Sequence, residues 1–207
     1  MNFTKNYFFN KAIIVALLSV FFIQTDAQNA DYQILKNISK HRSPSDTRFN
    51  HFISKTAPYL TVGTPILMYG IGLIEHDETL QKKSLEIGVA VAATVVETYA
   101  LKYMVKRPRP YITYPDLNSV DTEGTPSFPS GHSSGAFALA TSLSLNYPKW
   151  YVIVPSFAWA GLTGYSRMYL GVHYPTDVLI GAVIGSGTAW LTWKANKAWQ
   201  KRMGKKG

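Results

Sequence analysis

The sequence has no cysteine and few acidic residues. The lack of cysteine excludes disulfides and thiolate metal sites, and it removes the usual clue to the redox compartment. Aspartate and glutamate together number 12, against 21 lysines and arginines, which gives a formal net charge of +9 at pH 7. The sequence also lacks an H-E-x-x-H pattern. The charge balance favours an anionic partner, which could be a phosphate, a nucleic acid or an acidic lipid.

Residues 1–27 have the order of a secretory signal. A basic start is followed by the apolar run AIIVALLSVFFI and then by small residues before a cut after Ala27. The alternative is an uncleaved first membrane helix, because residues 7–23 are nearly long enough to span a bilayer. In both cases residue 28 emerges outside the cytoplasm, and residues 28–207 form a single domain.

Apolar stretches recur through the rest of the chain and predict an all-α helical bundle; they cover residues 56–74, 84–105, 133–148, 150–166 and 178–193. Most are shorter than the ~20 residues of a confident membrane span, and the mean hydropathy of −0.03 is low. However, small residues crowd several of them, which suits close helix packing in lipid. We therefore expect five or six transmembrane helices, with a compact soluble bundle as the alternative.

The charged turns favour one orientation. If the chain starts in the cytoplasm and each apolar stretch crosses once, then EHDETLQKK, NYPKW and the basic tail fall inside, as the positive-inside rule expects. The outer side is also basic, so the asymmetry is modest. This threading brings residues 28–55, 106–131 and 167–177 to the outer face. It leaves the acidic cluster EHDE (75–78) on the opposite face, as a solvated turn.

The outer stretch LKYMVKRPRPY carries four cations, of which Lys102 and Arg109 lie seven residues apart. Lys102 lies in the last turns of a predicted helix, and Arg109 follows between two prolines. Because proline ends a helix and forces the preceding residue into an extended path, Arg109 is lifted off the helix end. Taken alone, a basic cluster beside a helix is common.

The outer stretch PSGH opens the next helix. Ser130 is a suitable N-cap, and Gly131 allows a ligand to approach the backbone closely. The free N–H groups and the dipole at this helix end make an anion site, which His132 in the first turn would face. Taken alone, this could also be a capped helix start with an incidental histidine.

The stretch YSRMYLGVHYPTD combines Arg167 with a histidine and a carboxylate. Pro175 suits a first helical position and places Asp177 in the first turn of the following helix. That carboxylate can accept the proton on one nitrogen of His173 and so make the other nitrogen a better nucleophile. A His–Asp pair that only caps a helix is the alternative.

Together the three stretches offer what phosphoryl transfer needs. The equatorial oxygens must be neutralised, a nucleophile must lie in line, and the leaving oxygen needs a proton donor. Arginine serves the first need through bidentate pairing, and histidine serves the other two because its pKa lies near working pH.

This arrangement resembles the three-part signature of the type 2 phosphatidic acid phosphatase (PAP2) superfamily, over residues 102–177. The resemblance implies a phosphatase that needs no metal and no cofactor. His173 would attack phosphorus and form a phosphohistidine, with Asp177 holding it. His132 would protonate the leaving group and then activate water. The phosphoryl oxygens would be bound by Lys102, Arg109, Ser130, Gly131 and Arg167.

The superfamily contains membrane lipid phosphatases, soluble class A acid phosphatases and vanadium-dependent haloperoxidases. The resemblance to the first branch implies a bacterial inner membrane enzyme with its site facing the periplasm; a soluble periplasmic acid phosphatase is the alternative. The substrate would be a lipid phosphate or pyrophosphate, such as phosphatidic acid, phosphatidylglycerol phosphate, undecaprenyl pyrophosphate or a lipid A phosphate. Residues 106 and 107 could favour substrates with two phosphates. Nucleic acid is not expected, because only the net charge would support it.

Overall fold

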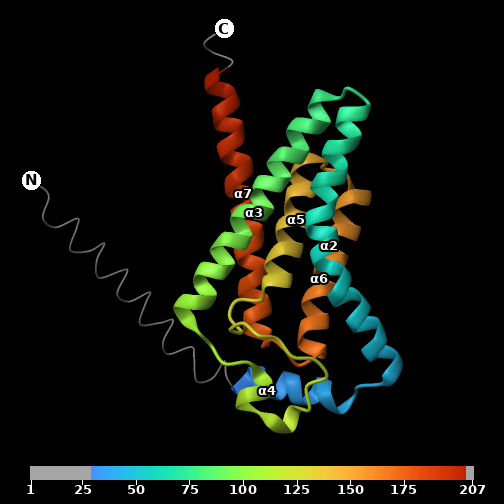
Figure 1. Cartoon of the computed structure of the whole chain (residues 1–207), viewed down its shortest axis with the longest axis vertical. Helices are drawn as coiled ribbons and strands as arrows, with labels where there is room; N and C mark the ends of the chain where they lie inside the picture. The colour runs from blue at the N-terminus through green and yellow to red at the C-terminus, as the bar shows by residue number, and fades with distance from the viewer. Residues whose placement is uncertain (1–28, 204–207) are drawn as a thin grey trace, which may run out of the picture.

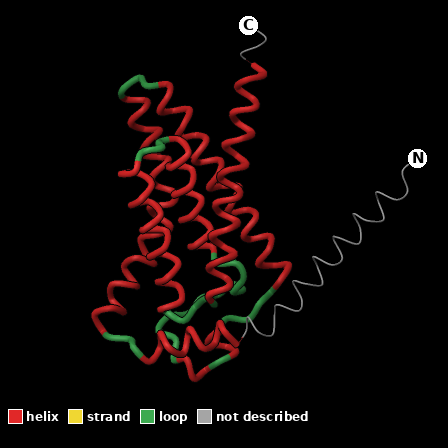
Figure 2. Tube along the Cα trace, turned by 180° about the vertical axis from the view of Figure 1, so that it is seen from behind, coloured by secondary structure: helices red, strands yellow, loops and turns green. Residues whose placement is uncertain are grey.

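The computed structural model describes residues 29–203, and all regular elements in this range are helices (Figures 1 and 2). The long helices are α2 (Pro44–Ile74), α3 (Glu78–Val105), α5 (Gly131–Asn146), α6 (Trp150–Tyr169) and α7 (Pro175–Met203). Short elements are a helix at residues 29–40, α4 (Pro110–Thr113) and η1 (Pro115–Leu117). The all-α prediction is confirmed. The predicted signal peptide or first membrane helix lies outside the described residues.

The three motif stretches meet at one end of the bundle. The helix at residues 29–40, α4 and the loop that leads to α5 gather there in Figure 1, together with the turn between α6 and α7. The α2–α3 turn and the end of α7 lie at the opposite end. At that far end Asp77 caps α3 by accepting from the N–H of Thr79 at 2.8 Å. The EHDE cluster is therefore a turn remote from the motifs, as the sequence predicted.

Helix α2 starts well before the apolar stretch at residues 56–74. The sequence indicates a surface segment or a short amphipathic helix over residues 28–55, whereas residues 44–55 form the first part of the long helix α2. The hydroxyl of Ser43 accepts from the N–H of Asp46 at 3.2 Å, and Pro44 occupies the first helical position. A capping serine followed by proline and an early aspartate starts a helix without needing an apolar face. The added turns bring Ser54 close to the motif residues.

Helix α5 lies at the centre of the bundle and packs against α2, α3, α6 and α7. Its contact with α7 depends on two glycines, because a Cβ on Gly181 would lie 2.8 Å from the carbonyl oxygen of Ser130. A Cβ on Gly185 would overlap the carbonyl oxygen of Ser134. The small residues of the apolar stretch at 178–193 therefore bring the α5 and α7 backbones into contact.

The outside of the bundle is apolar. On α2, for example, Ile66 and Leu67 are 64% and 68% exposed, and on α3 Val96 is 71% exposed. By length and composition, two segments within residues 29–203 could cross a membrane: Pro44–Ile74 and Glu78–Thr113. Exposed apolar surface on this scale marks an interaction surface, and lipid is the partner that covers a bundle on several sides.

Candidate active site

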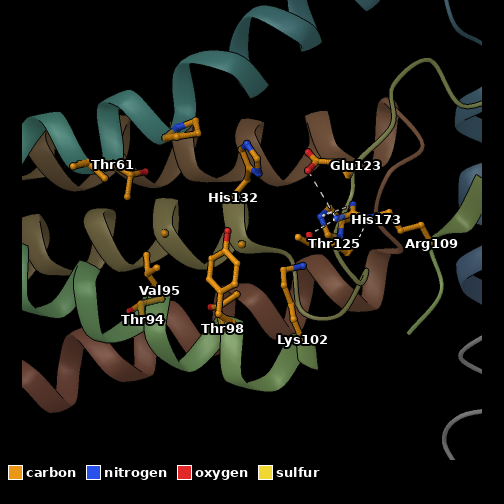
Figure 3. Close-up of a pocket in the computed structure, with 15 residues that line it drawn as sticks. Thr61, Thr94, Val95, Thr98, Lys102, Arg109, Glu123, Thr125, His132 and His173 are labelled. Atoms are coloured by element: carbon orange, nitrogen blue, oxygen red, sulfur yellow. Dashed lines mark hydrogen bonds and ion pairs between the residues drawn. The ribbon is translucent and has the colours of Figure 1, made fainter. Parts of the chain in front are cut away.

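A cavity of about 260 Å³ lies where the motif stretches meet, between α2, α3 and the start of α5 (Figure 3). Its lining includes five of the predicted site residues: Lys102, Arg109, Gly131, His132 and His173. The other three, Ser130, Arg167 and Asp177, are buried directly behind this lining. The structure thus brings residues from α3, α5, α6, α7 and two loops into one site.

His173 lies in the turn between α6 and α7 and is 2% exposed. Its Nδ1 is 3.4 Å from Oδ2 of Asp177, and its Nε2 is 3.3 Å from Nη1 of Arg109. A carboxylate can only accept and a guanidinium can only donate, so both contacts place the proton on Nδ1 and leave Nε2 unprotonated, with its lone pair accepting from Arg109. Burial lowers the pKa of His173 to about 3, against the opposing effect of Asp177. The ring is therefore neutral near pH 7.

Asp177 is fully buried at the first turn of α7, where Pro175 opens the helix as predicted. Its Oδ2 accepts from the hydroxyl of Ser127 and, at 3.0 Å, from the N–H of Tyr174. Its Oδ1 accepts from Nη1 of Arg107 at 2.7 Å. These donors hold the carboxylate in its charged form and fix the oxygen that faces His173.

Arg107 lies behind the site and not in the cavity lining. Its Nη2 donates to Oδ2 of Asp31 at 2.9 Å, and its guanidinium stacks 3.8 Å from the ring centroid of Tyr174. Burial lowers the pKa of Arg107, but Asp177 and Asp31 outweigh this and raise it above its usual value. The suggestion that Arg107 contacts a second phosphate does not fit this position; the residue supports Asp177 instead.

Asp31 comes from the helix at residues 29–40, in the stretch whose sequence indicates a surface segment or a short amphipathic helix. Its Oδ1 also accepts from the N–H of Thr176 at 3.0 Å, at the start of α7. Asp31, Arg107 and Asp177 therefore form a chain of charges behind His173. Nothing in the spacing of Asp31 from the motifs could have revealed this link.

Lys102 and Arg109 point into the cavity from α3 and from the loop after it (Figure 3). Nζ of Lys102 donates to the carbonyl of Pro126 at 2.6 Å, and Nε of Arg109 donates to the carbonyl of Thr125 at 2.7 Å. Each cation thus fixes the loop that forms the cavity wall. Lys102 also donates to the carbonyl of Ser127 at 3.4 Å, which leaves one N–H for an anion because an ammonium carries three donors.

At the start of α5, Ser130 is the N-cap, as predicted. Its hydroxyl accepts from the hydroxyl of Ser133 at 3.0 Å and is turned towards the helix rather than the cavity. Gly131 and His132 face the cavity, at the helix end whose dipole favours anions. A direct contact between Ser130 and phosphate stays a prediction.

Arg167, in the last turn of α6, is paired with a carboxylate that sequence reasoning missed. Its Nη2 donates to Oε1 of Glu123, and its Nη1 donates to the hydroxyl of Ser54. Oε2 of Glu123 lies 3.9 Å from Nη2 of Arg109. Burial raises the pKa of Glu123, but Arg167 and Arg109 outweigh this and hold it below its usual value. Glu123 is an isolated acid in an irregular loop, so no motif marks it.

The family model of the PAP2 superfamily matches residues 83–201. This range contains the whole cavity except its α2 wall. The chain belongs to the PAP2 superfamily.

Three proteins show how this PAP2 chain compares with known relatives. It is 29% identical over 159 residues to undecaprenyl-diphosphatase BcrC of Bacillus subtilis, covering 74% of this chain and 78% of that protein. It is 41% identical over 64 residues to the lipid A 4'-phosphatase of Bacteroides thetaiotaomicron, covering 31% of this chain and 28% of that protein. The transmembrane PAP2 type phosphatidylglycerolphosphate phosphatase of Bacillus subtilis matches in structure with a TM-score of 0.73 and 28% identity, over 90% of this chain and 94% of that one.

Proposed function

We propose that this protein hydrolyses the terminal phosphate of a membrane lipid phosphate or diphosphate through a phosphohistidine on His173. The observation that carries the proposal is the neutral His173 with its unprotonated Nε2, which lines one cavity with Lys102, Arg109 and the α5 terminus. The names of the three relatives support it, since each describes the removal of phosphate from a lipid.

A second cavity supports a lipid rather than a soluble substrate. It has a volume of about 660 Å³ and lies between α2 and α3, with a lining dominated by valine, isoleucine and other apolar side chains. Val62 and Val95 line both cavities, so the apolar groove continues directly from the phosphate site. A phosphate head group in the first cavity would leave its acyl or prenyl chain in this groove.

In the first step, the lone pair on Nε2 of His173 attacks phosphorus and the bond from phosphorus to the leaving oxygen breaks. His132 donates a proton to that oxygen, which leaves as the lipid alcohol or the lipid monophosphate. In the free enzyme, burial and the charges of Arg167 and Arg109 lower the pKa of His132 to about 3, so this proton enters the site with the phosphate head group, whose negative charge favours the protonated imidazole. The Nδ1 proton of His173 stays hydrogen-bonded to Asp177, which stabilises the positive charge that develops on the ring. Lys102, Arg109 and Arg167 neutralise the equatorial oxygens.

In the second step, water attacks phosphorus and the bond between phosphorus and Nε2 breaks. His132, now neutral, accepts a proton from this water, so that the same side chain serves as acid and then as base. The products are inorganic phosphate and the regenerated His173.

The decisive test compares phosphate release by the detergent-solubilised wild type and by His173→Ala, in EDTA, on a panel of lipid phosphates and on a small soluble phosphoester. We expect metal-independent release from lipid that is lost in the variant. Release from the soluble ester alone would support the secreted acid phosphatase instead. Equal release by wild type and variant would refute the phosphohistidine.

We also propose that the site faces the periplasm from a bacterial inner membrane. The absence of cysteine makes this testable, because single introduced cysteines can be labelled without background. Lys40, near the site, and Glu75, at the far turn, are both exposed. A membrane-impermeant maleimide on intact spheroplasts should label Lys40→Cys and spare Glu75→Cys; the reverse pattern would invert the orientation.

A further inference from the structure

The carboxylate of Glu123 occupies the place where a phosphate group would bind. It contacts Arg167 through Oε1 and lies 3.9 Å from Arg109 through Oε2, so it pairs with two of the three proposed phosphate-binding cations. Glu123 belongs to the cavity lining (Figure 3), whereas Arg167 is buried and is not part of that lining. A head group therefore reaches Arg167 only after this carboxylate has moved.

The backbone of Glu123 is held in place by Tyr111, independently of the contacts of the Glu123 side chain. The hydroxyl of Tyr111 donates to the carbonyl of Glu123 at 2.9 Å and accepts from its N–H at 3.2 Å. The side chain is 29% exposed, on the solvent side of the two arginines. The carboxylate can thus swing away by rotation of its side chain, while Tyr111 keeps the loop in place.

Arg167 retains one unused donor. Its Nε is buried and has no hydrogen-bond partner within the described residues. A buried guanidinium donor without an acceptor is costly, and a tetrahedral oxyanion offers more acceptor oxygens than one carboxylate. Glu123 therefore leaves a hydrogen-bond donor of Arg167 without an acceptor. A ligand with more acceptor oxygens can replace the carboxylate and pair with that donor.

We propose that Glu123 sets the affinity of the site for phosphate by competing with the head group for Arg167 and Arg109. Because competition is a property of the free enzyme, it lowers the affinity for every phosphate-bearing ligand by one common factor. Only head groups that bind the arginines strongly, such as terminal phosphates and diphosphates, then occupy the site. The phosphodiester head groups of bulk membrane lipids bind the arginines too weakly to displace the carboxylate of Glu123. This inference rests on the proposed function.

The test replaces Glu123 by glutamine, which keeps the shape and removes the charge. We expect the inhibition constants of inorganic phosphate and of phosphatidylglycerol in mixed micelles to fall by the same factor, of about tenfold, which corresponds to about 1.4 kcal/mol. Inhibition by the dephosphorylated lipid should not change, because that ligand has no phosphate to meet the arginines. The matched control is Asp121→Asn, which removes a negative charge from the same loop, where Asp121 lies 3.7 Å from Nδ1 of His51 and makes no direct ion pair with Arg109 or Arg167.

Thermal stabilisation by inorganic phosphate gives a readout that needs no turnover, since a ligand stabilises by an amount set by its dissociation constant. If the wild type hydrolyses lipid phosphates but Glu123→Gln binds phosphate equally or more weakly, Glu123 orients Arg167 and does not compete, and the inference is wrong. An equal gain in the Asp121→Asn control would also overturn it. If Glu123→Gln binds phosphate more tightly but the wild type releases none from any lipid, the competition stands and the proposed function fails.

Discussion

Arg107 and Asp177 form an ion pair behind His173, the proposed nucleophile, with Nη1 of Arg107 2.7 Å from Oδ1 of Asp177. The side chain of Asp177 is fully buried and that of Arg107 is 19% exposed. Because the other carboxylate oxygen faces Nδ1 of His173, the position of Arg107 fixes the orientation of the imidazole ring. The same guanidinium is shared with Asp31, so the helix at residues 29–40 is part of this support.

Replacing Arg107 should therefore reduce turnover without weakening substrate binding. We expect Arg107→Gln to lower kcat by about 10- to 100-fold with little change in KM, because a small misplacement of the nucleophile is costly whereas the cavity lining is untouched. Arg107→Lys should recover part of the activity, since it restores the charge but not both hydrogen bonds. Lys106→Gln, at the exposed neighbouring position, is the matched control. A rise in KM instead would place Arg107 in substrate binding.

The buried neutral His173 should make the protein less stable in acid. Its pKa is about 3 in the folded state, below the value of about 6.5 of a free histidine. The unfolded state thus binds the extra proton, and this contribution to stability is complete above about pH 6.5 and is lost as the pH falls towards 3. The contribution of His173 can be measured by comparing the thermal unfolding of the wild type and of His173→Gln at pH 7 and pH 5. The loss on acidification should be smaller in the variant; an equal loss would contradict the assignment.

Blocking the groove between α2 and α3 should affect lipid substrates alone. Val62 lines both cavities, and Val62→Trp would fill their junction. We expect KM for a long-chain lipid phosphate to rise about tenfold, equivalent to about 1.4 kcal/mol, while turnover of a small phosphoester is retained. Leu67→Trp is the control, because Leu67 lies on the same helix, is 68% exposed and lines neither cavity. Equal losses on both substrates would show that the tail lies elsewhere.

The contact between α5 and α7 should tolerate no added methyl group at its glycines. Gly185→Ala would force a Cβ against the backbone of Ser134 and 2.9 Å from the N–H of Ala138. Overpacking of this kind costs about 1–3 kcal/mol, so thermal unfolding should occur at a clearly lower temperature. Gly187→Ala, two residues along the same helix, meets nothing within 4 Å and should leave stability equal or slightly higher. Similar behaviour of the two variants would refute the close approach.

Much of the site could be predicted from sequence, because its residues follow local rules. Ser130 caps α5, Pro175 opens α7, and Asp177 lies in the first turn of α7, as the motif chemistry required. The gathering of the motif stretches at one end followed from counting helix crossings. The helix boundaries were less predictable, since α2 begins at a polar capping sequence that the hydropathy pattern does not register.

The residues that sequence reasoning missed act through contacts between distant segments. Asp31 meets Arg107 and Thr176 across a separation in sequence that no pattern records, and Glu123 meets Arg167 from an irregular loop. Their side chains become informative only once the fold has placed the partner charges beside them.

The glycine contact between α5 and α7 divides the molecule into two parts that tolerate changes in sequence to different degrees. His132 and Asp177 stand at the starts of these two helices, whose backbones touch and leave little freedom to move. The apolar groove, in contrast, is bounded by α2 and α3, on the other side of the phosphate cavity. Changes in lipid preference can therefore accumulate on α2 and the facing side of α3 while the reaction geometry is inherited intact. A chimera that exchanges only residues 65–69 of α2 between relatives, and leaves Ser54 on Arg167, would test whether substrate choice transfers without rebuilding the chemistry.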